Sequence, residues 1–137
     1  MKVSLVPLEQ INNIWDSICP FLEPAVEVTN GRYTTYDVYV LLQTSKMCLW
    51  VAFDDDGVIN GIQVTAITDY PSKRALTSVF TGGINLRSWR EPMMVMLQNW
   101  AKDNGCQIIE GYGREGWVKM LQPYGVRMTQ VAFEKEV

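Results

Sequence analysis

The middle of the chain constrains the fold most, because three β-rich runs follow one another there with only tight turns between them. The first turn, Asp54-Asp55-Asp56-Gly57, contains the Asp-Gly pair that favours a hairpin. The second turn is centred on Pro71. This pattern predicts an antiparallel meander of three strands over residues 47–53, 58–70 and 75–81.

Two helices are expected before this meander. Apolar residues recur at helical spacing over residues 8–18, and Pro20 is expected to stop that helix. Residues 21–32 contain proline, asparagine and glycine and are expected to be irregular. Thr34 is expected to cap a second, short helix that ends near Lys46.

A strongly amphipathic helix is predicted after the meander. Ser88 and Glu91 have the spacing of a capping box, and Gly105 is expected to end the helix. The apolar face consists of Trp89, Met93, Met96, Leu97, Trp100 and Ala101. Packing into the core explains such a face, although exposed tryptophan and methionine would instead mark a surface for a protein partner.

The remaining elements complete a mixed sheet. Short strands are expected at residues 3–6, 106–110 and 126–135, and a further helix is expected to begin near Arg114 and to end before Gly125. The predicted order is β-α-α-β-β-β-α-β-α-β. We therefore expect an α/β (α+β) fold in one domain of residues 1–137, with a mixed, mostly antiparallel sheet of six to seven strands and about four helices.

Composition excludes several classes of protein. The formal net charge is −3 and the isoelectric point is about 4.9, whereas a nucleic-acid binder is usually basic. No apolar run is long enough to span a membrane, and the first residues do not resemble a signal peptide. We therefore expect a cytoplasmic protein without nucleic-acid or membrane partners.

Side chains for metal or nucleophilic chemistry are scarce. The chain has no histidine, which excludes serine–histidine and cysteine–histidine catalysis. Cys19, Cys48 and Cys106 lie far apart, without zinc-binding spacing, and are expected to be small buried residues in a reducing compartment. The three consecutive aspartates at positions 54–56 are of the residue type that binds metal ions. A hairpin turn explains them without a metal, so no metal ligand is predicted.

The predicted order, and the C-terminal third above all, resembles the GNAT N-acetyltransferase superfamily. Residues 93–106 resemble the central helix of that fold and its glycine stop, and residues 107–110 resemble the strand that follows. Residues 116–126 resemble the last helix with its terminal glycine. The motif Gly113-Arg114-Glu115-Gly116-Trp117 is similar to one in small GNAT-like proteins of tailed phages.

The resemblance implies acetyl-CoA as a cofactor. In active members the acyl-CoA lies between the fourth and fifth strands, and backbone N–H groups before the next helix hold its pyrophosphate. The corresponding segment here makes Phe80, Thr81, Gly82, Gly83 and Ile84 the candidate cofactor-binding residues. Because the glycines precede an arginine instead of following it, the alternative is that they form only a turn and the end of a strand.

Acetyl transfer also needs a base for the amine and a proton donor for the departing thiolate. Without histidine the base has to be a carboxylate, and Glu110, near the end of a strand beside the implied cleft, is the candidate. Tyr112 is the alternative acid. The superfamily's usual tyrosine and asparagine on the last helix are replaced by Leu121 and Arg114. The simpler alternative makes Glu110 a surface charge and Tyr112 a packing residue.

Two functions are therefore expected from the resemblance. The first is an acyl-CoA-dependent N-acetyltransferase, encoded by a phage or by a cell, that acts on a small amine or on a protein. The second is a non-catalytic GNAT-like protein that binds a protein partner, such as a phage virion or assembly component or an inhibitor of a host factor. Both allow a homodimer, and a phage protein would act in the host cytoplasm or in the virion.

Overall fold

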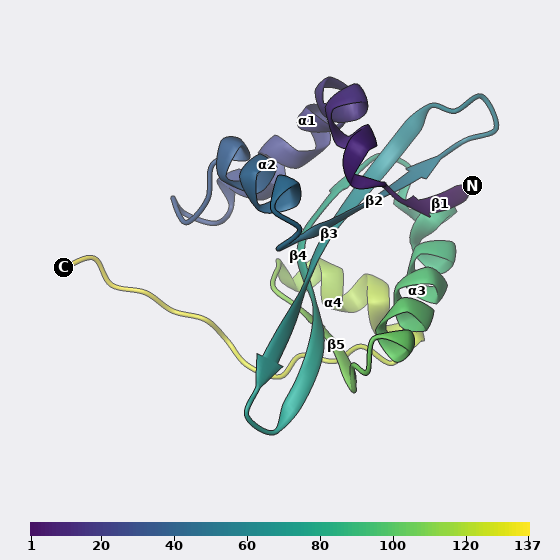
Figure 1. The fold of residues 1–137 in the computed structure, drawn as a ribbon. Coiled ribbons are helices and arrows are strands. Elements are labelled where there is room, and N and C mark those ends of the chain that lie inside the picture. The colour runs from purple at the N-terminus through teal and green to yellow at the C-terminus, as the bar shows by residue number, and fades with distance from the viewer.

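A computed structural model describes residues 1–137. Five strands form one sheet in the order β1-β2-β3-β4-β5, with α1 and α2 on one face and α3 on the other (Figure 1). The strands are β1 (Lys2–Leu5), β2 (Cys48–Phe53), β3 (Ile59–Tyr70), β4 (Lys73–Gly83) and β5 (Ile108–Gly111), and the helices are α1 (Ile11–Glu27), α2 (Thr35–Gln43), α3 (Leu86–Asp103) and α4 (Glu115–Leu121). None of the helices combines the length and the apolar character needed to cross a membrane.

The predicted antiparallel meander is confirmed, and it forms the middle of the sheet. β2 pairs with β3, and β3 pairs with β4 along nearly the whole length of both strands. The turn before β3 depends on Asp54, whose Oδ1 accepts hydrogen bonds from the amides of Asp56 and Val58 at 3.0 and 2.9 Å. The Asp54 carboxylate therefore stabilises a hairpin turn, which is how the sequence analysis explained the run of aspartates.

One core lies between the sheet and the pair α1 and α2. Ile18, Leu22 and Val38 from the helices pack there against Ile62 and Val64 of β3. α2 begins as predicted, because Thr34 Oγ1 accepts from the Asp37 amide while Asp37 Oδ2 accepts from the Thr34 amide. This reciprocal cap satisfies two backbone donors that no earlier helical turn could satisfy.

A second core lies between the sheet and α3. Trp89, Met93, Leu97 and Ala101 are the buried residues of α3, so the predicted apolar face is largely correct. Met96 is 39% exposed, and Trp100 is half-buried with its ring 5.7 Å from that of Trp50. The three cysteines carry free thiols and are half-buried instead of fully buried.

The prediction that Pro20 ends the first helix is wrong. α1 continues through Pro20 and Pro24 to Glu27, so residues 21–27 are helical and not irregular. Both prolines lie on the exposed side of α1, where the carbonyls that lose their amide partners can bond to water. On the opposite side, the burial of Leu22 and Val26 favours a continuous helix.

The predicted capping box at Ser88 and Glu91 is also wrong. α3 begins earlier, at Leu86, because Asn85 takes the left-handed conformation with φ of 54° and reverses the chain after β4. Ser88 is consequently inside the first turn, where its hydroxyl donates to the Asn85 carbonyl at 2.6 Å.

The expected last strand at residues 126–135 does not form, so the sheet has five strands and not six to seven. No backbone group of residues 126–137 takes part in a backbone hydrogen bond, and the segment extends away from α4 (Figure 1, yellow). Its Glu134 carboxylate accepts hydrogen bonds from Asn30 and Arg32 at 3.2 and 3.1 Å. An alternating pattern predicts a strand only where a neighbouring strand edge is in register with it.

Gly82 offers a test of how β4 packs against α1. A Cβ atom at Gly82 would lie 2.1 Å from the Phe21 carbonyl oxygen, so α1 would have to move. We expect Gly82→Ala to lower the free energy of unfolding by about 1–3 kcal/mol, measured by urea denaturation. The control Gly116→Ala, where no atom lies within 4 Å, should leave stability unchanged or raise it. Equal stability of Gly82→Ala and wild type would contradict the close approach.

Candidate functional site

The candidate site is the opening where β4 and β5 part. The two strands are parallel and pair only from Ala75 with Ile108 to Ser78 with Gly111. β5 then ends while β4 continues to Gly83, still paired with β3 on its other side. A β-bulge at the parting point leaves Val79 without a partner on β3. Bulges bend a strand, which suits a site where β4 must leave β5.

The open edge of β4 presents backbone groups that no strand bonds. Successive residues of an antiparallel pair turn their N–H and C=O groups alternately toward and away from the partner strand. The Ile84 amide donates to the Asn60 carbonyl at 2.7 Å, so Ile84 and Gly82 face β3. Thr81 and Gly83 therefore direct their backbone groups toward the opening, where an extended ligand that carries amides could pair with them.

The opening leads to the N-terminus of α3. The Asn85 side chain donates to Asn60 Oδ1 at 3.0 Å, which fixes the turn between β4 and α3. In the first turn, the amides of Leu86 and Arg87 have no partner within the helix. Arg87 is exposed and forms no ion pair with a carboxylate. Free amides, the helix dipole and a cation together favour a bound anion at this point.

The five cofactor candidates have different environments. The Phe80 side chain is buried with its ring 5.3 Å from that of Tyr33, so only its backbone could meet a ligand. Gly82 and Gly83 pack against α1 and β3, which gives both glycines a packing role in the end of the strand. The Ile84 amide is already used, whereas Thr81 keeps a free backbone edge.

The two catalytic candidates lie together on the β5 side of the parting point, at the last paired residues and just beyond them. Glu110 lies opposite Thr77, and its Oε2 accepts hydrogen bonds from Tyr70 Oη at 2.7 Å and from Thr77 Oγ1 at 3.2 Å. Its Oε1 has no partner and is free to accept a proton. These contacts raise the pKa of Tyr70, first through the hydrogen bond to Glu110, then through partial burial and the neighbouring Tyr112.

Glu110 and the open end of β4 are separated along the sheet. Thr77 precedes Phe80 by three residues, a rise of roughly 10 Å along a strand. Tyr112 is mostly exposed and lies close to Tyr70. The structure therefore brings Glu110 and Tyr112 together, but it leaves a gap between them and the cofactor candidates that a water molecule or a substrate would have to bridge.

A buried polar cluster at the parting point was missed by the sequence analysis. Gln63 is 5% exposed, donates to Ser78 Oγ and accepts from Thr81 Oγ1 at 2.9 Å. Gly111, the last residue of β5, packs against Ser78. The signal was available, because Gln63 lies between the apolar Ile62 and Val64, and a buried amide needs bonding partners.

α4 lies beside the opening and is loosely held. None of its residues is fully buried. Arg90 of α3 donates to the Met120 carbonyl at 3.3 Å, and its guanidinium lies 5.9 Å from the centre of the Tyr124 ring. Leu121 is half-buried at the end of α4, so the structure places no phenol where the resemblance would require the proton donor.

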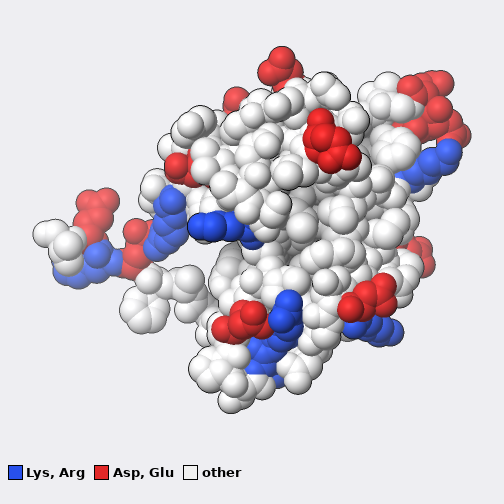
Figure 2. Space-filling model, viewed as in Figure 1, with Lys and Arg blue, Asp and Glu red and all other residues white.

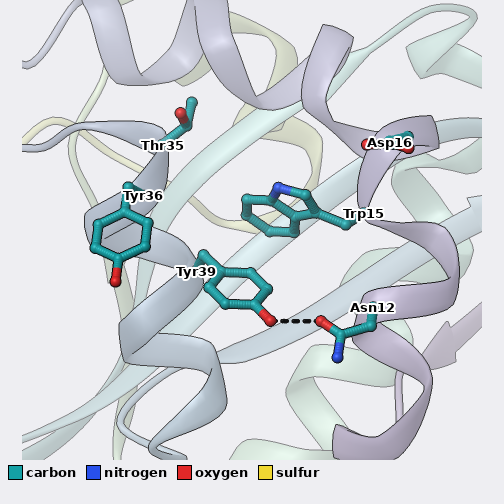
Figure 3. Close-up of a pocket in the computed structure, with 6 residues that line it drawn as sticks. All are labelled: Asn12, Trp15, Asp16, Thr35, Tyr36 and Tyr39. Carbon is teal, nitrogen blue, oxygen red and sulfur yellow. Dashed lines mark hydrogen bonds between the residues drawn. The ribbon is translucent and has the colours of Figure 1, made fainter.

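A separate hollow of about 470 Å³ lies between α1 and α2 (Figure 3). The Tyr39 ring lies 5.0 Å from that of Trp15 and 6.4 Å from that of Tyr36, and Tyr39 Oη donates to Asn12 Oδ1 at 2.5 Å. The exposed Asp16 carboxylate also lines the hollow. Aromatic rings beside a carboxylate suit a positively charged group.

The surface charges show no single dominant patch on the face drawn in Figure 2, where cationic and anionic side chains alternate around largely uncharged atoms. The ion pairs of the molecule are Arg32 with Glu134 and Arg74 with Asp69.

The hydrogen bond between Tyr70 and Glu110 has a measurable consequence. Because it favours the neutral phenol, the folded state keeps a proton that the unfolded state loses above about pH 10. The unfolded state then binds fewer protons, so stability falls as the pH rises from that value through the folded pKa.

Phenolate absorbance during an alkaline titration checks this point. One of the six tyrosines should ionise well after the others, and Tyr70→Phe should abolish that late step. Tyr36→Phe, at an exposed ring, is the control and should leave that late step in place. Retention of the late step in Tyr70→Phe would disprove the assignment.

Three solved structures share this architecture. A ribosomal-protein-alanine N-acetyltransferase from Brucella melitensis biovar Abortus 2308 superposes with a TM-score of 0.73 at 13% identity, over 100% of both chains. The aminoglycoside antibiotic 6'-N-acetyltransferase from Acinetobacter baumannii gives 0.67 at 14%, over 99% of this chain and 98% of the other. A predicted acetyltransferase with acetyl-CoA from Clostridium acetobutylicum gives 0.67 at 14%, over 98% and 95%.

No protein-family model matches the chain, and no curated protein is similar to it in sequence. At these identities the structural likeness establishes the fold alone. The chain therefore has the fold of the acetyltransferases that the resemblance indicated, with one mixed sheet that opens between β4 and β5.

Proposed function

We propose that the chain is an acyl-CoA-dependent N-acetyltransferase that uses acetyl-CoA and acts on a small amine or a protein amino group. The observation that carries the proposal is the parting of β4 from β5 after Ser78, beside the free amides of α3. The similar structures include one acetyltransferase with acetyl-CoA, one that acts on an aminoglycoside and one that acts on a ribosomal protein, according to their names.

The residues at the opening fit such a cofactor. The amide-bearing arm of CoA could pair with the backbone of Thr81 and Gly83, and its phosphates could bind at the amides of Leu86 and Arg87 with the Arg87 guanidinium beside them. When bound, acetyl-CoA supplies an activated acetyl thioester. The half-buried hydroxyls of Ser78 and Thr81 line the parting point and could help to hold the arm in place.

Glu110 has the geometry of a general base. Tyr70 and Thr77 both bond to Oε2, which orients the carboxylate and leaves Oε1 to accept a proton from an amine, directly or through water. The rise of roughly 10 Å along β4 from Thr77, which lies opposite Glu110, to Phe80 favours the route through water. Tyr112 is the nearby phenol and takes the role of acid in this proposal, because Leu121 cannot donate a proton.

The hollow between α1 and α2 supports an acceptor that carries more than one positive charge. Trp15 and Tyr39 present aromatic surface there, and Asp16 supplies a carboxylate. A second ammonium group of the acceptor could bind at this hollow while a neutral amine reacts at the opening.

A second candidate function is favoured by residues 126–137. Val131 and Phe133 are 78% and 97% exposed, and the segment has no backbone hydrogen bond. Exposed apolar residues on an unpaired segment suit a protein partner. In this alternative the chain is a non-catalytic GNAT-like binding protein, for example a phage virion or assembly component or an inhibitor of a host factor, and either function allows a homodimer.

Calorimetric titration with acetyl-CoA separates the two functions. At about 100 times its dissociation constant, the cofactor should raise the free energy of unfolding by about 2.7 kcal/mol, which a thermal-shift measurement would detect. Absence of binding at about millimolar cofactor, a very weak affinity for any specific site, would reject the enzyme and direct the search toward a protein partner.

Substitution of Glu110 tests the proposed base. We expect Glu110→Gln to slow acetyl transfer by about 10² to 10⁴-fold while cofactor affinity is retained, because only the proton acceptor is lost. Glu27→Gln, at an exposed residue at the end of α1, is the control and should leave the rate unchanged. An unchanged rate in Glu110→Gln would remove Glu110 from the mechanism.

A further inference from the structure

A second hollow, of about 420 Å³, lies outside the opening described above. β2 begins at Cys48, opposite Thr65 of β3, whereas β3 runs on to Tyr70. The edge of β3 is therefore unpaired beyond Thr65, on the side facing away from β4. The loop between α2 and β2 and the Trp100 side chain of α3 complete the hollow.

One buried hydrogen-bond donor beside this hollow has no acceptor. Arg74 Nε is buried and has no hydrogen-bond partner. Thr65 also lines the hollow, but it is 0% exposed and its Oγ1 already accepts from Trp50 Nε1 at 2.9 Å. Buried donors are normally satisfied, so the unsatisfied Arg74 guanidinium favours a ligand that supplies acceptor atoms.

The arrangement of the strands explains why Arg74 faces the hollow. Thr65, Ile67 and Asp69 alternate along β3 on the side that faces α3, and Asp69 lies opposite Arg74 of β4. The Arg74 backbone is fixed on both sides of its peptide, because its amide donates to Gln107 Oε1 and its carbonyl accepts from the Gln107 amide, both at 2.9 Å. The guanidinium is thereby directed across the hairpin toward the hollow.

The charges lining the hollow favour an anion. Lys46 and Arg74 contribute two positive charges, and Asp69 is the one carboxylate among the lining residues. Asp69 is mostly exposed, and its Oδ1 lies 3.4 Å from Arg74 Nη1, a long contact that leaves the other guanidinium nitrogens free.

The other walls of the hollow are apolar. Ala66, Ile67 and the half-buried Trp100 ring line it, and burial raises the pKa of the Cys48 thiol, so that Cys48 stays neutral beside them. We propose that this hollow binds a small organic anion, whose carboxylate or phosphate group accepts hydrogen bonds from the Arg74 guanidinium near Lys46 while its apolar part packs on Trp100. This site is independent of the proposed acetyl transfer.

Nuclear magnetic resonance of the tryptophan indoles provides a local readout, because Trp50 bonds to Thr65 and Trp100 lines the hollow. The probes are benzoate and phenyl phosphate, with acetate and inorganic phosphate as probes that lack the apolar part. We expect saturable shifts of the Trp50 and Trp100 indole signals with one or both aromatic probes, and weaker binding of the two small ions. The stronger aromatic probe identifies the carboxylate or the phosphate as the preferred group.

Variants test the assignment of the cations. Lys46→Met and Arg74→Gln should each weaken the binding of the better probe on the order of tenfold, as expected for loss of one charge-assisted hydrogen bond. Lys46 is exposed, so its variant keeps the test valid even if Arg74→Gln destabilises the fold. The matched control Lys73→Met, on the same hairpin but outside the hollow, should bind as wild type does.

Three results would overturn the proposal. These are the absence of saturable indole shifts with every probe, wild-type affinity in Lys46→Met, and an equal loss of affinity in Lys73→Met, which would indicate only general attraction by surface charge.

Discussion

The short pairing of β4 with β5 determines how the rest of the structure is arranged. β4 keeps β3 as a partner along nearly its full length, but it keeps β5 for only four residue pairs. The bulge at Val79 turns β4 away from β5, and the close approach of Gly82 to the Phe21 carbonyl holds the departing end of β4 against α1. The opening therefore exists because β4 is fixed on one side and unpaired on the other.

Local chemistry allowed much of the fold to be predicted from the sequence. The Asp-Gly hairpin, the cap at Thr34 and the glycine after α3 depend on side chains close in sequence, and the structure has all three. The errors have a different origin. α1 passes through Pro20 because distant strands bury its other side, and residues 126–135 form no strand because no neighbouring edge pairs with them.

The candidate site was predictable only in part, for the same reason. The position of Glu110 on a strand end follows from the order of elements, but its contact with Tyr70 joins residues far apart in the chain. The cluster of Gln63, Ser78 and Thr81 likewise depends on the register of β3 and β4 and on the bulge between them. The sequence shows which polar residues stand beside apolar ones. The register that brings them together depends on the pairing of all the strands in the sheet.

The extended C-terminal segment gives the chain a region whose stability differs from that of the rest. Residues 126–137 contribute no backbone hydrogen bond and bury no fully covered side chain, and the Glu134 carboxylate is their link to Asn30 and Arg32. Segments of this kind open at almost no free-energy cost and are the first that a protease cleaves. A cut after Gly125 would remove the exposed Val131 and Phe133 and leave every helix and strand intact. The trimmed chain would therefore keep the fold but expose less apolar surface to other molecules.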